Sequence, residues 1–542
     1  MTRHLLIILG AIIRFGMLLV AAMTAIATPL DAGETRPNIL FIFSDDHATQ
    51  AIGAYDGRLK GVDPTPNIDA LAREGMLFKN SFCTNSICGP SRAVILTGKH
   101  SHMNGFMSNR NRFDGSQQTF PKLLQKAGYQ TAIIGKWHLK SDPQGFDHWD
   151  ILPGQGEYYN PVLTSKEGSR QLEGHCTSVV TNLAVKWLDK NRNNDKPFML
   201  MCQHKAPHRC WMPAPEHLNL YDDIDLPEPA TLFDKFEDNA AAARNQEMEI
   251  DRHMHLVYDL FANPPDNWDG EPDLETDRSG QNNLKQMTSE QLKVWNAAFQ
   301  DENDALDKAN LTGKELLRWK YQRYAKNYLR CVRGVDDSVG QLLQYLKDND
   351  LEDNTIVVYS SDQGFYVGDH GWYDKRWMYE ESLKMPLIVK WPGKTKPGSV
   401  NTNLVQNLDY AETLLAAAGA EIPDDMQGRS LVPLLEGKTV SDWRTSIYYH
   451  YYQYPGIHMC PRHNGIRTER YKLMQIYEFG EWEFYDLEKD PDEIANVYND
   501  PDYQTQVATL KSELENLRVQ YGDQTVTGVR PQAWRDEHRA IK

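Results

Sequence analysis

Residues 37–46 read Pro-Asn-Ile-Leu-Phe-Ile-Phe-Ser-Asp-Asp, an unbroken apolar run that ends in two carboxylates. Because apolar and polar residues do not alternate over residues 37–43, this stretch predicts a strand that is buried on both faces. Similar short apolar runs follow at residues 130–134, 198–202, 355–359 and 387–390. Helical patterns lie between the runs at residues 67–74, 91–96, 120–127, 178–190 and 314–347. This order predicts an α/β fold with a large mixed, mostly parallel sheet flanked by helices.

The pattern changes twice along the chain. The stretch of about 215–310 is acidic and rich in Asn, Asp and Gln, which predicts an insertion over the surface that we interpret as a lid. From residue 440 on, short strand patterns and one helical pattern predict a smaller α+β subdomain. We expect these strands at residues 447–452, 465–467, 471–475 and 483–486, and the helix at residues 503–521. The sequence therefore predicts a main domain at residues 33–439 and a C-terminal subdomain at residues 440–542.

The N-terminal segment has the composition of a targeting sequence. A basic start precedes two apolar runs that are separated by Arg14, and Ala25-Ile26-Ala27 suits a signal cleavage site. A retained membrane anchor is the alternative, but a charge near the middle of a span costs about 2.5–3.5 kcal/mol. We therefore predict that residues 1–32 are a signal peptide. The mature protein is then exported, periplasmic or secreted, with no stable membrane insertion after cleavage.

The overall charge restricts the possible partners. The 542 residues carry a formal net charge of −17, which argues against nucleic acid or an anionic membrane surface as a partner. An acidic substrate is repelled at long range, so a site for one needs a local cluster of cations. Seven cysteines are too few for a disulfide scaffold, and no CxxC pair suggests zinc. Their odd number leaves at least one thiol unpaired.

Polar side chains follow two of the predicted strands directly. Asp45 and Asp46 end the first strand, and Asp362 and Gln363 end the strand at residues 355–359. Because ligands bind at the carboxyl ends of the strands in such sheets, these side chains are expected to converge. Hard oxygen ligands without Cys or His favour calcium or magnesium over zinc. The alternative is that these Asp residues only cap turns or helices.

The segment Cys88-Gly89-Pro90-Ser91-Arg92 is the second feature that suggests chemistry. Pro90 suits the first turn of a helix, so Cys88 is expected just before its N-terminus. Arg92, four residues on, can share a helix face with Cys88 and form an anion-receptive pocket beside it. From the residues alone, Cys88 is a candidate nucleophile, and a buried structural thiol or a disulfide partner is the alternative.

Downstream of a strand that ends in Asp-Asp, the Cys-x-Pro-Ser-Arg motif resembles the signature of the type I, formylglycine-dependent sulfatases of the alkaline phosphatase superfamily. The resemblance extends from Asn38 to Gly393. It includes Pro66-Asn67-Ile68-Asp69-Ala70-Leu71, Gly135-Lys136-Trp137-His138, Pro207-His208 and the region of Asp362. It implies a sulfuric ester hydrolase in which Cys88 is oxidised to formylglycine (3-oxoalanine) by a formylglycine-generating maturation enzyme.

The resemblance also implies roles for individual residues. The ligands of one Ca²⁺ are expected to be Asp45, Asp46, Asp362, Gln363 and modified residue 88, although many relatives have Asn or His at the position of Gln363. The catalytic group is expected to comprise Cys88, Arg92, His138 as the base, and His208 as the acid for the leaving alcohol. The sulfate is expected to bind Lys136, which points the same way as His138 if the chain is extended there, and Lys375.

The substrate is less narrowly defined by the sequence. Residues 364–380 resemble the sugar-sulfatase branch, which implies that Asp374 and Arg376 bind sugar hydroxyls beside the sulfate; the alternative is a local ion pair. His463 is a further predicted sugar contact. These features favour a 6-O-sulfated N-acetylglucosamine in a glycosaminoglycan or other glycan, with an algal glycan or a uronate 2-sulfate as alternatives.

Two other functions are compatible with the same fold. A phosphatase or phosphodiesterase could use the same metal site, but the full Cys88 motif disfavours it. A non-catalytic glycan-binding relative would require that Cys88 remain unmodified, because every expected catalytic position is filled.

Overall fold

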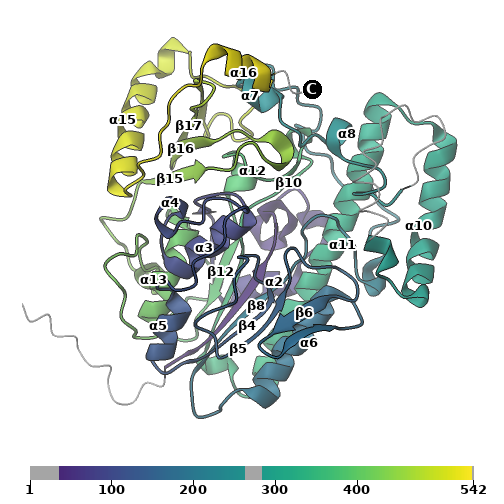
Figure 1. Ribbon diagram of the computed structural model, residues 1–542, viewed down its shortest axis with the longest axis vertical. Helices are drawn as coiled ribbons and strands as arrows, with labels where there is room; N and C mark the ends of the chain where they lie inside the picture. Colours follow the sequence, from purple (N-terminus) through teal and green to yellow (C-terminus); the bar gives the residue numbers. More distant parts are fainter. Residues whose placement is uncertain (1–35, 263–282, 540–542) are drawn as a thin grey trace, which may run out of the picture. The chain divides into compact units, whose positions relative to one another are not determined.

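The computed structural model describes residues 36–262 and 283–539, so the predicted signal peptide at residues 1–32 lies outside the described residues. The described residues from Pro37 onward form one compact unit built on a ten-stranded sheet (Figure 1). Its strands, in spatial order, are β13 (Ser399–Asn401), β2 (Met76–Phe78), β12 (Leu387–Lys390), β9 (Thr355–Ser361), β1 (Asn38–Ser44), β8 (Phe198–Gln203), β4 (Gln130–Lys136), β5 (His148–Leu152), β6 (Val162–Ser165) and β7 (Gly168–Gln171).

The centre of the sheet is parallel. β1 pairs in parallel with both β9 and β8, β8 with β4, and β4 with β5. Antiparallel pairs flank this centre, with β12 on β9 and on β2, and β6 on β5 and on β7. The predicted mixed, mostly parallel sheet is therefore confirmed. The register between β1 and β9 places Ser44 opposite Ser361, so the acidic residues that follow each strand emerge side by side.

The two faces of β1 pack against different helical layers. Ile39, Phe41 and Phe43 belong to the core beneath one layer, whereas Leu40 and Ile42 belong to the core beneath the other. This alternation follows from the period of two in a strand and explains why its apolar run is unbroken. The first layer holds α3 (Cys88–Thr97), α5 (Phe120–Lys126) and α13 (Tyr410–Ala417), and the second holds α2 (Pro66–Glu74), α6 (Cys176–Lys186) and α11 (Gly313–Asp348) (Figure 1).

The segment predicted as an insertion is mostly irregular, with short helices. It contains α7 (Ala241–Arg244), α8 (Ile250–His253) and the longer α10 (Ser289–Ala309), which starts with a capping box at Thr288. Part of the predicted segment, residues 263–282, lies outside the described residues. Within residues 36–262 and 283–539, no helix combines the length and the apolar character that a membrane span requires.

A separate four-stranded antiparallel sheet forms from the C-terminal part of the chain, as predicted. Its strands are β15 (Ser446–Tyr451), β16 (His463–Thr468), β17 (Tyr471–Ile476) and β18 (Glu481–Asp486). α15 (Gln504–Gln520) packs on this sheet, and α16 (Gln532–Arg539) follows it. The remaining short elements are α4 (Ser101–Asn104), α12 (Glu380–Leu383), α14 (Val432–Leu435), and the pairs β10 (Tyr366–Val367) with β11 (Tyr373–Asp374) and β3 (Ser81–Phe82) with β14 (Val405–Gln406).

Candidate active site

Three carboxylates meet where β1 and β9 end. Oxygens of Asp45, Asp46 and Asp362 lie within 4.8 Å of one another, and all three side chains are fully buried. Asp46 has a left-handed backbone (φ 69°), and its N–H donates to Oδ1 of Asp362 at 3.1 Å. The hydroxyl of Tyr328 on α11 donates to the carbonyl of Asp46 at 2.7 Å and holds the backbone of this turn in place. The parallel register of the two strands thus produces the convergence that the sequence predicted.

Three basic side chains from other elements contact these carboxylates. Arg92 on α3 donates through Nε and Nη2 to Oδ2 of Asp362 at 3.1 and 3.0 Å. Lys136, the last residue of β4, donates to Asp45, and Nζ of Lys375 lies 2.6 Å from Oδ2 of Asp46. Each of the three carboxylates therefore has a basic partner within the chain. This satisfies the requirement that buried charges be paired.

Burial and charge act in opposite directions on the Asp46–Lys375 pair. Burial raises the pKa of Asp46 to about 7, even though Lys375 acts to lower it. Burial alone would lower the pKa of Lys375, but the acidic groups around it, Asp46 first and then Cys88 and Asp374, together outweigh burial and raise the pKa. Lys375 therefore carries its charge into the site at neutral pH.

Two buried oxygens in the cluster lack a hydrogen-bond partner among the described residues: Oδ1 of Asp45 and Oε1 of Gln363. Gln363 donates instead through Nε2 to Asp46, and to Oδ1 of Asp362 at 2.8 Å. A half-turn of this amide would add a neutral oxygen to the three carboxylates. The resulting set consists of hard oxygen donors only, which fits a divalent cation such as Ca²⁺ or Mg²⁺.

Cys88 lies beside this cluster at the start of α3. The helix begins at Cys88 itself rather than after it, and the preceding Ile87 offers no side-chain cap to the free N–H groups. The thiol is 1% exposed, and burial raises its pKa to about 12. It forms no disulfide, and the other six cysteines are also free and buried. The unmodified thiol is therefore protonated and weakly nucleophilic at neutral pH.

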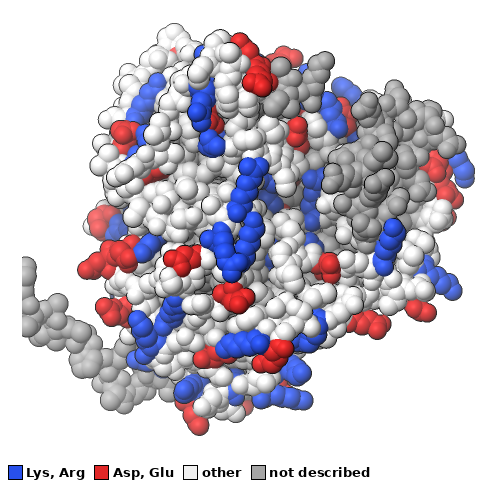
Figure 2. Space-filling view, in the orientation of Figure 1, with Lys and Arg blue, Asp and Glu red and all other residues white. Residues whose placement is uncertain are grey.

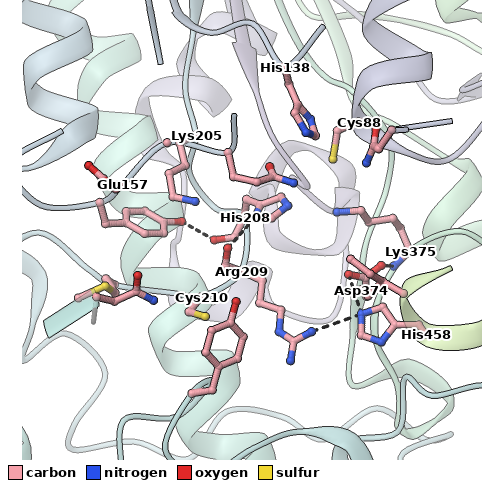
Figure 3. Close-up of a pocket in the computed structure, with 18 of the residues that line it drawn as sticks. Cys88, His138, Glu157, Lys205, His208, Arg209, Cys210, Asp374, Lys375 and His458 are labelled. Carbon is pink, nitrogen blue, oxygen red and sulfur yellow. Dashed lines mark hydrogen bonds and ion pairs between the residues drawn. The ribbon is translucent and has the colours of Figure 1, made fainter. Parts of the chain in front are cut away.

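Two histidines extend from separate loops toward Cys88 (Figure 3). Burial, followed by the charges of Lys136 and Arg92, holds the pKa of His138 well below its usual value, and its Nδ1 has no partner among the described residues. His138 has φ 56°, so the chain is not extended there, and the predicted reason for its direction is wrong. Nδ1 of His208 forms a hydrogen bond with the carbonyl of Arg209 at 2.6 Å. The other ring nitrogen, Nε2, therefore faces Asp46 and lies 3.8 Å from its Oδ2. Both rings are neutral and lie beside the reacting position.

Cys88, His138 and His208 line one cavity of about 390 Å³, whereas the three carboxylates of the cluster are not part of its lining. Asp374, Lys375 and Arg376 form part of its wall. Oδ1 of Asp374 accepts from Nε of Arg376 at 2.9 Å, and its Oδ2 lies 3.3 Å from Nε2 of His458. The predicted local ion pair therefore exists, and both of its members also face the cavity.

The structure adds cavity residues that the sequence reasoning missed. Lys205 is 5% exposed, and its Nζ lies over the ring of Tyr158, 4.7 Å from the ring centroid. It makes no salt bridge within the described residues. Nη2 of Arg209 donates to Oδ2 of Asp259, a residue of the insertion, at 3.0 Å. Its Nη1 lies 3.4 Å from Nε2 of His458 (Figure 3). Lys205 and Arg209 adjoin the Ala-Pro-His motif, so their positions could have been suspected. Nothing in the sequence relates His458 to Asp374.

His463 is not on the cavity wall. It is fully buried, and its ring stacks on Trp377, Tyr449 and Tyr451 at centroid distances of 4.9–5.5 Å. A side chain enclosed by three aromatic rings has no surface with which to bind a sugar, so the prediction for His463 is wrong. The histidine of the C-terminal part of the chain that lines the cavity is His458, five residues earlier.

The chain matches the family described as Sulfatase over residues 37–420, which include the three carboxylates, Cys88, Arg92, Lys136, His138, His208 and Lys375. This protein is a sulfatase. As a member of the family it is a sulfate ester hydrolase with an alkaline phosphatase-like fold. Residues 368–520 match the family described as N-sulphoglucosamine sulphohydrolase, C-terminal.

Several relatives of this sulfatase act on aminosugars. It is 46% identical to the N-acetylglucosamine-6-O-sulfatase of Bacteroides thetaiotaomicron over 93% of this chain and 90% of the relative. It is 27% identical to the human N-acetylglucosamine-6-sulfatase over 86% and 82% of the two chains. A solved structure in complex with its substrate, D-glucosamine-2-N,6-O-disulfate, is 46% identical with a TM-score of 0.86, covering 90% of this chain and 99% of that one.

Although the net charge is −17, Lys and Arg side chains gather near the middle of the face drawn in Figure 2. Within the cavity, the cations of Lys205, Arg209, Lys375 and Arg376 outnumber the carboxylates of Glu157 and Asp374. The site thus contains the local cationic cluster that an anionic substrate requires.

Proposed function

We propose that this sulfatase hydrolyses the 6-O-sulfate ester of N-acetylglucosamine in a glycosaminoglycan or another glycan. The observation that carries the proposal is that Cys88, His138, His208 and a set of cations line one cavity of about 390 Å³. Three buried carboxylates meet next to it, and a carboxylate oxygen of Asp45 lies within 4.8 Å of the ligand atoms of Cys88 and His208. The volume of the cavity is within the range of about 300–1,000 Å³ that is typical of small-molecule sites. The substrate named for the relative with 46% identity supports the choice of sugar and sulfate position.

We propose that Cys88 is converted to formylglycine by a maturation enzyme and that one calcium ion is held by Asp45, Asp46, Asp362 and Gln363. The raised pKa of the thiol supports modification, because the unmodified group is a poor nucleophile. When present, the calcium ion supplies a Lewis acid and the hydrated aldehyde supplies an oxygen nucleophile.

In this proposal, cationic side chains balance the charge of the sulfate. Arg92 lies against Asp362 and, through Nη1, binds the carbonyl of Lys136 at 2.8 Å, so its orientation is fixed before substrate enters. Lys136 and Lys375 are similarly held by Asp45 and Asp46. Such preorganised groups stabilise negative charge that develops on the sulfate oxygens as the ester bond breaks.

The two histidines handle protons. His138 is neutral and has an unpartnered Nδ1, so it can accept a proton from the nucleophile. His208 presents Nε2 to the cavity and is the acid for the leaving alcohol. Burial and the nearby lysines lower its pKa, whereas a bound sulfate anion acts in the opposite direction and favours protonation when substrate is present.

The sugar ring contacts the far wall of the cavity. Asp374 and Arg376 have polar atoms beside the position of Lys375, and His458 adds a third group on the same wall. These three side chains provide hydrogen bonds for sugar hydroxyls next to the sulfate. We also propose that residues 1–32 direct the export of the protein. Outside the cytoplasm, the enzyme meets such polysaccharides.

Hydrolysis of a panel of sugars sulfated at defined positions tests the proposal. The expected result is the highest kcat/KM for N-acetylglucosamine 6-sulfate, well above its 3-sulfate and above a uronate 2-sulfate. A preference for another position would overturn the assignment of the substrate. The 6-phosphate of the same sugar is the matched control, and faster hydrolysis of the phosphate would favour the phosphatase alternative instead.

A further inference from the structure

A second cavity, of about 670 Å³, lies beside the active-site cavity. Two chain segments separate the cavities. Asn109 and Gln453 line the active-site cavity, whereas their neighbours Ser108 and Tyr452 line the second one. The N–H of Asn109 donates to Oε1 of Gln453 at 2.9 Å and joins the two segments. Because consecutive Cα atoms are about 3.8 Å apart, only one layer of chain separates the two cavities.

The second cavity has a positive lining in an acidic protein. Its charged side chains are Arg462, Arg530 and Glu478, which leaves one positive charge in excess. Nη1 of Arg462 and Nε of Arg530 both donate to Oε1 of Glu478, at 2.8 and 3.1 Å. Glu478 is 2% exposed, so this carboxylate is a fixed anchor for both guanidinium groups.

Arg530 has binding capacity that the protein does not use. Its Nε is held by Glu478, but within residues 36–262 and 283–539 no side chain or carbonyl accepts a hydrogen bond from Nη1 or Nη2. The side chain is 51% exposed. A guanidinium that is anchored at one nitrogen and free at the other two is preorganised to bind a carboxylate or a sulfate through both. Tyr452 and Tyr477 also line this cavity, although their side chains are largely buried.

We propose that this second cavity binds an acidic sugar unit of the same glycan whose sulfated residue occupies the active-site cavity. The inference rests on the proposed function, since it requires a glycan substrate. Arg530 binds the acidic group of that unit, either a uronate carboxylate or a second sulfate, and Arg462 and Glu478 position it. The enzyme thereby distinguishes acidic glycans from neutral ones that carry the same terminal sulfated sugar.

The test compares three substrates that share a terminal N-acetylglucosamine 6-sulfate: the monosaccharide, a tetrasaccharide with uronate as the next unit, and a tetrasaccharide with neutral galactose as the next unit. In Arg530→Ala, the ratio of kcat/KM for the uronate tetrasaccharide to that for the monosaccharide is expected to fall about tenfold. The same ratio for the galactose tetrasaccharide is expected to stay constant. Because each value is a ratio, a general loss of folded protein cancels.

Arg470→Ala is the matched control, because Arg470 is a similarly exposed arginine of the same subdomain, is paired with Asp486, and does not line the cavity. Unchanged ratios in Arg530→Ala, or an equal fall in Arg470→Ala, would overturn the proposal. Calorimetric binding of the same tetrasaccharides to the wild type and Arg530→Ala separates this failure from that of the proposed function. A wild type that binds the uronate tetrasaccharide more tightly than Arg530→Ala but hydrolyses none of the three retains the second site and loses the function. Binding of inorganic sulfate with no difference between the tetrasaccharides would also contradict the proposal.

Discussion

At the scale of single residues, Cys88 combines deep burial with a polar environment. Its thiol is 1% exposed, yet it lines the active-site cavity rather than filling a hydrophobic core. Removing Sγ therefore extends an existing cavity and leaves no new void. Cys88→Ala is expected to abolish sulfate ester hydrolysis while the melting temperature stays within a few degrees of the wild type.

Activity on N-acetylglucosamine 6-sulfate and a thermal melt measure both parts of this prediction. A loss of about 2–5 kcal/mol in the free energy of unfolding, the range for truncating a large core side chain, would mean that Cys88 is structural. Cys83, which is fully buried on the same side of the sheet, provides the comparison as Cys83→Ala.

Lys375 contacts the carboxylate of Asp46 at 2.6 Å and keeps its charge inside the cavity. Lys375→Met is expected to lower kcat/KM by about 10²–10³, the usual effect of removing one preorganised donor to a developing anion. Steady-state kinetics on the monosaccharide measure this loss. Lys384→Met, which removes a more exposed lysine near Glu380, is the control and is expected to keep near-normal kinetics. Near-normal kinetics in Lys375→Met would remove that lysine from the site.

The residues that could be predicted from the sequence are those whose position follows from one element. Asp45 and Asp362 follow parallel neighbouring strands, so their convergence is a property of the sheet. His458 could not be predicted, because its contact with Asp374 joins two loops with no shared element. His463 was predicted as a sugar contact, but it begins β16, where its ring packs against Trp377 in the buried aromatic cluster.

At the scale of elements, β4 and β8 approach each other unusually closely at Gly135. A Cβ at this position would lie 1.8 Å from the carbonyl oxygen of Gln203, and the backbone has φ 108°. Gly135→Ala is expected to destabilise the protein by about 3 kcal/mol or more, since neither the space nor the dihedral angle admits a side chain.

Urea unfolding measures the loss for Gly135→Ala. Gly61→Ala is the control, because a Cβ there meets no atom within 4 Å, and it is expected to change stability by less than about 0.5 kcal/mol. Since Lys136 follows Gly135 directly, the rate of hydrolysis is also expected to fall. Equal stability of the two variants would contradict the argument from close approach.

Long apolar strands and long helices were predictable, and short edge elements were not. The central strands carry unbroken apolar runs and α11 carries a periodic apolar pattern, and both are visible in the local sequence. The outer strand β7 is mostly exposed, and β2 and β13 have only three residues each, so they lack such a pattern. Their pairing depends on neighbours that are distant in the sequence.

At the scale of the whole molecule, the imidazole of His370 pairs with carboxylates from two segments that are distant in the sequence. It lies 3.0 Å from Asp234 of the insertion and 3.9 Å from Glu381 on α12. Burial acts to lower its pKa, but these carboxylates outweigh burial and raise it to about 9. The resulting stabilisation is complete below pH 6.5 and is lost as the pH rises through about 9.

The free energy of unfolding is therefore expected to fall between pH 7 and 9.5, by at most about 3 kcal/mol from this group. Urea unfolding at a series of pH values measures the slope. Asp234→Asn is expected to flatten it, whereas the control Asp238→Asn, at an exposed position, is expected to leave it unchanged. The same slope in both variants would show that His370 is not the group responsible.

The left-handed backbone at Asp46 recurs at His138, Asp374, Arg376 and His458, so five residues around one cavity hold conformations that L-amino acids rarely adopt. The direction of each of these side chains depends on the unusual dihedral angles of its own backbone. Anyone who transplants this chemistry onto another scaffold by copying side chains alone would aim them elsewhere. The loops, with the tertiary contacts that hold them, are the unit that must be grafted.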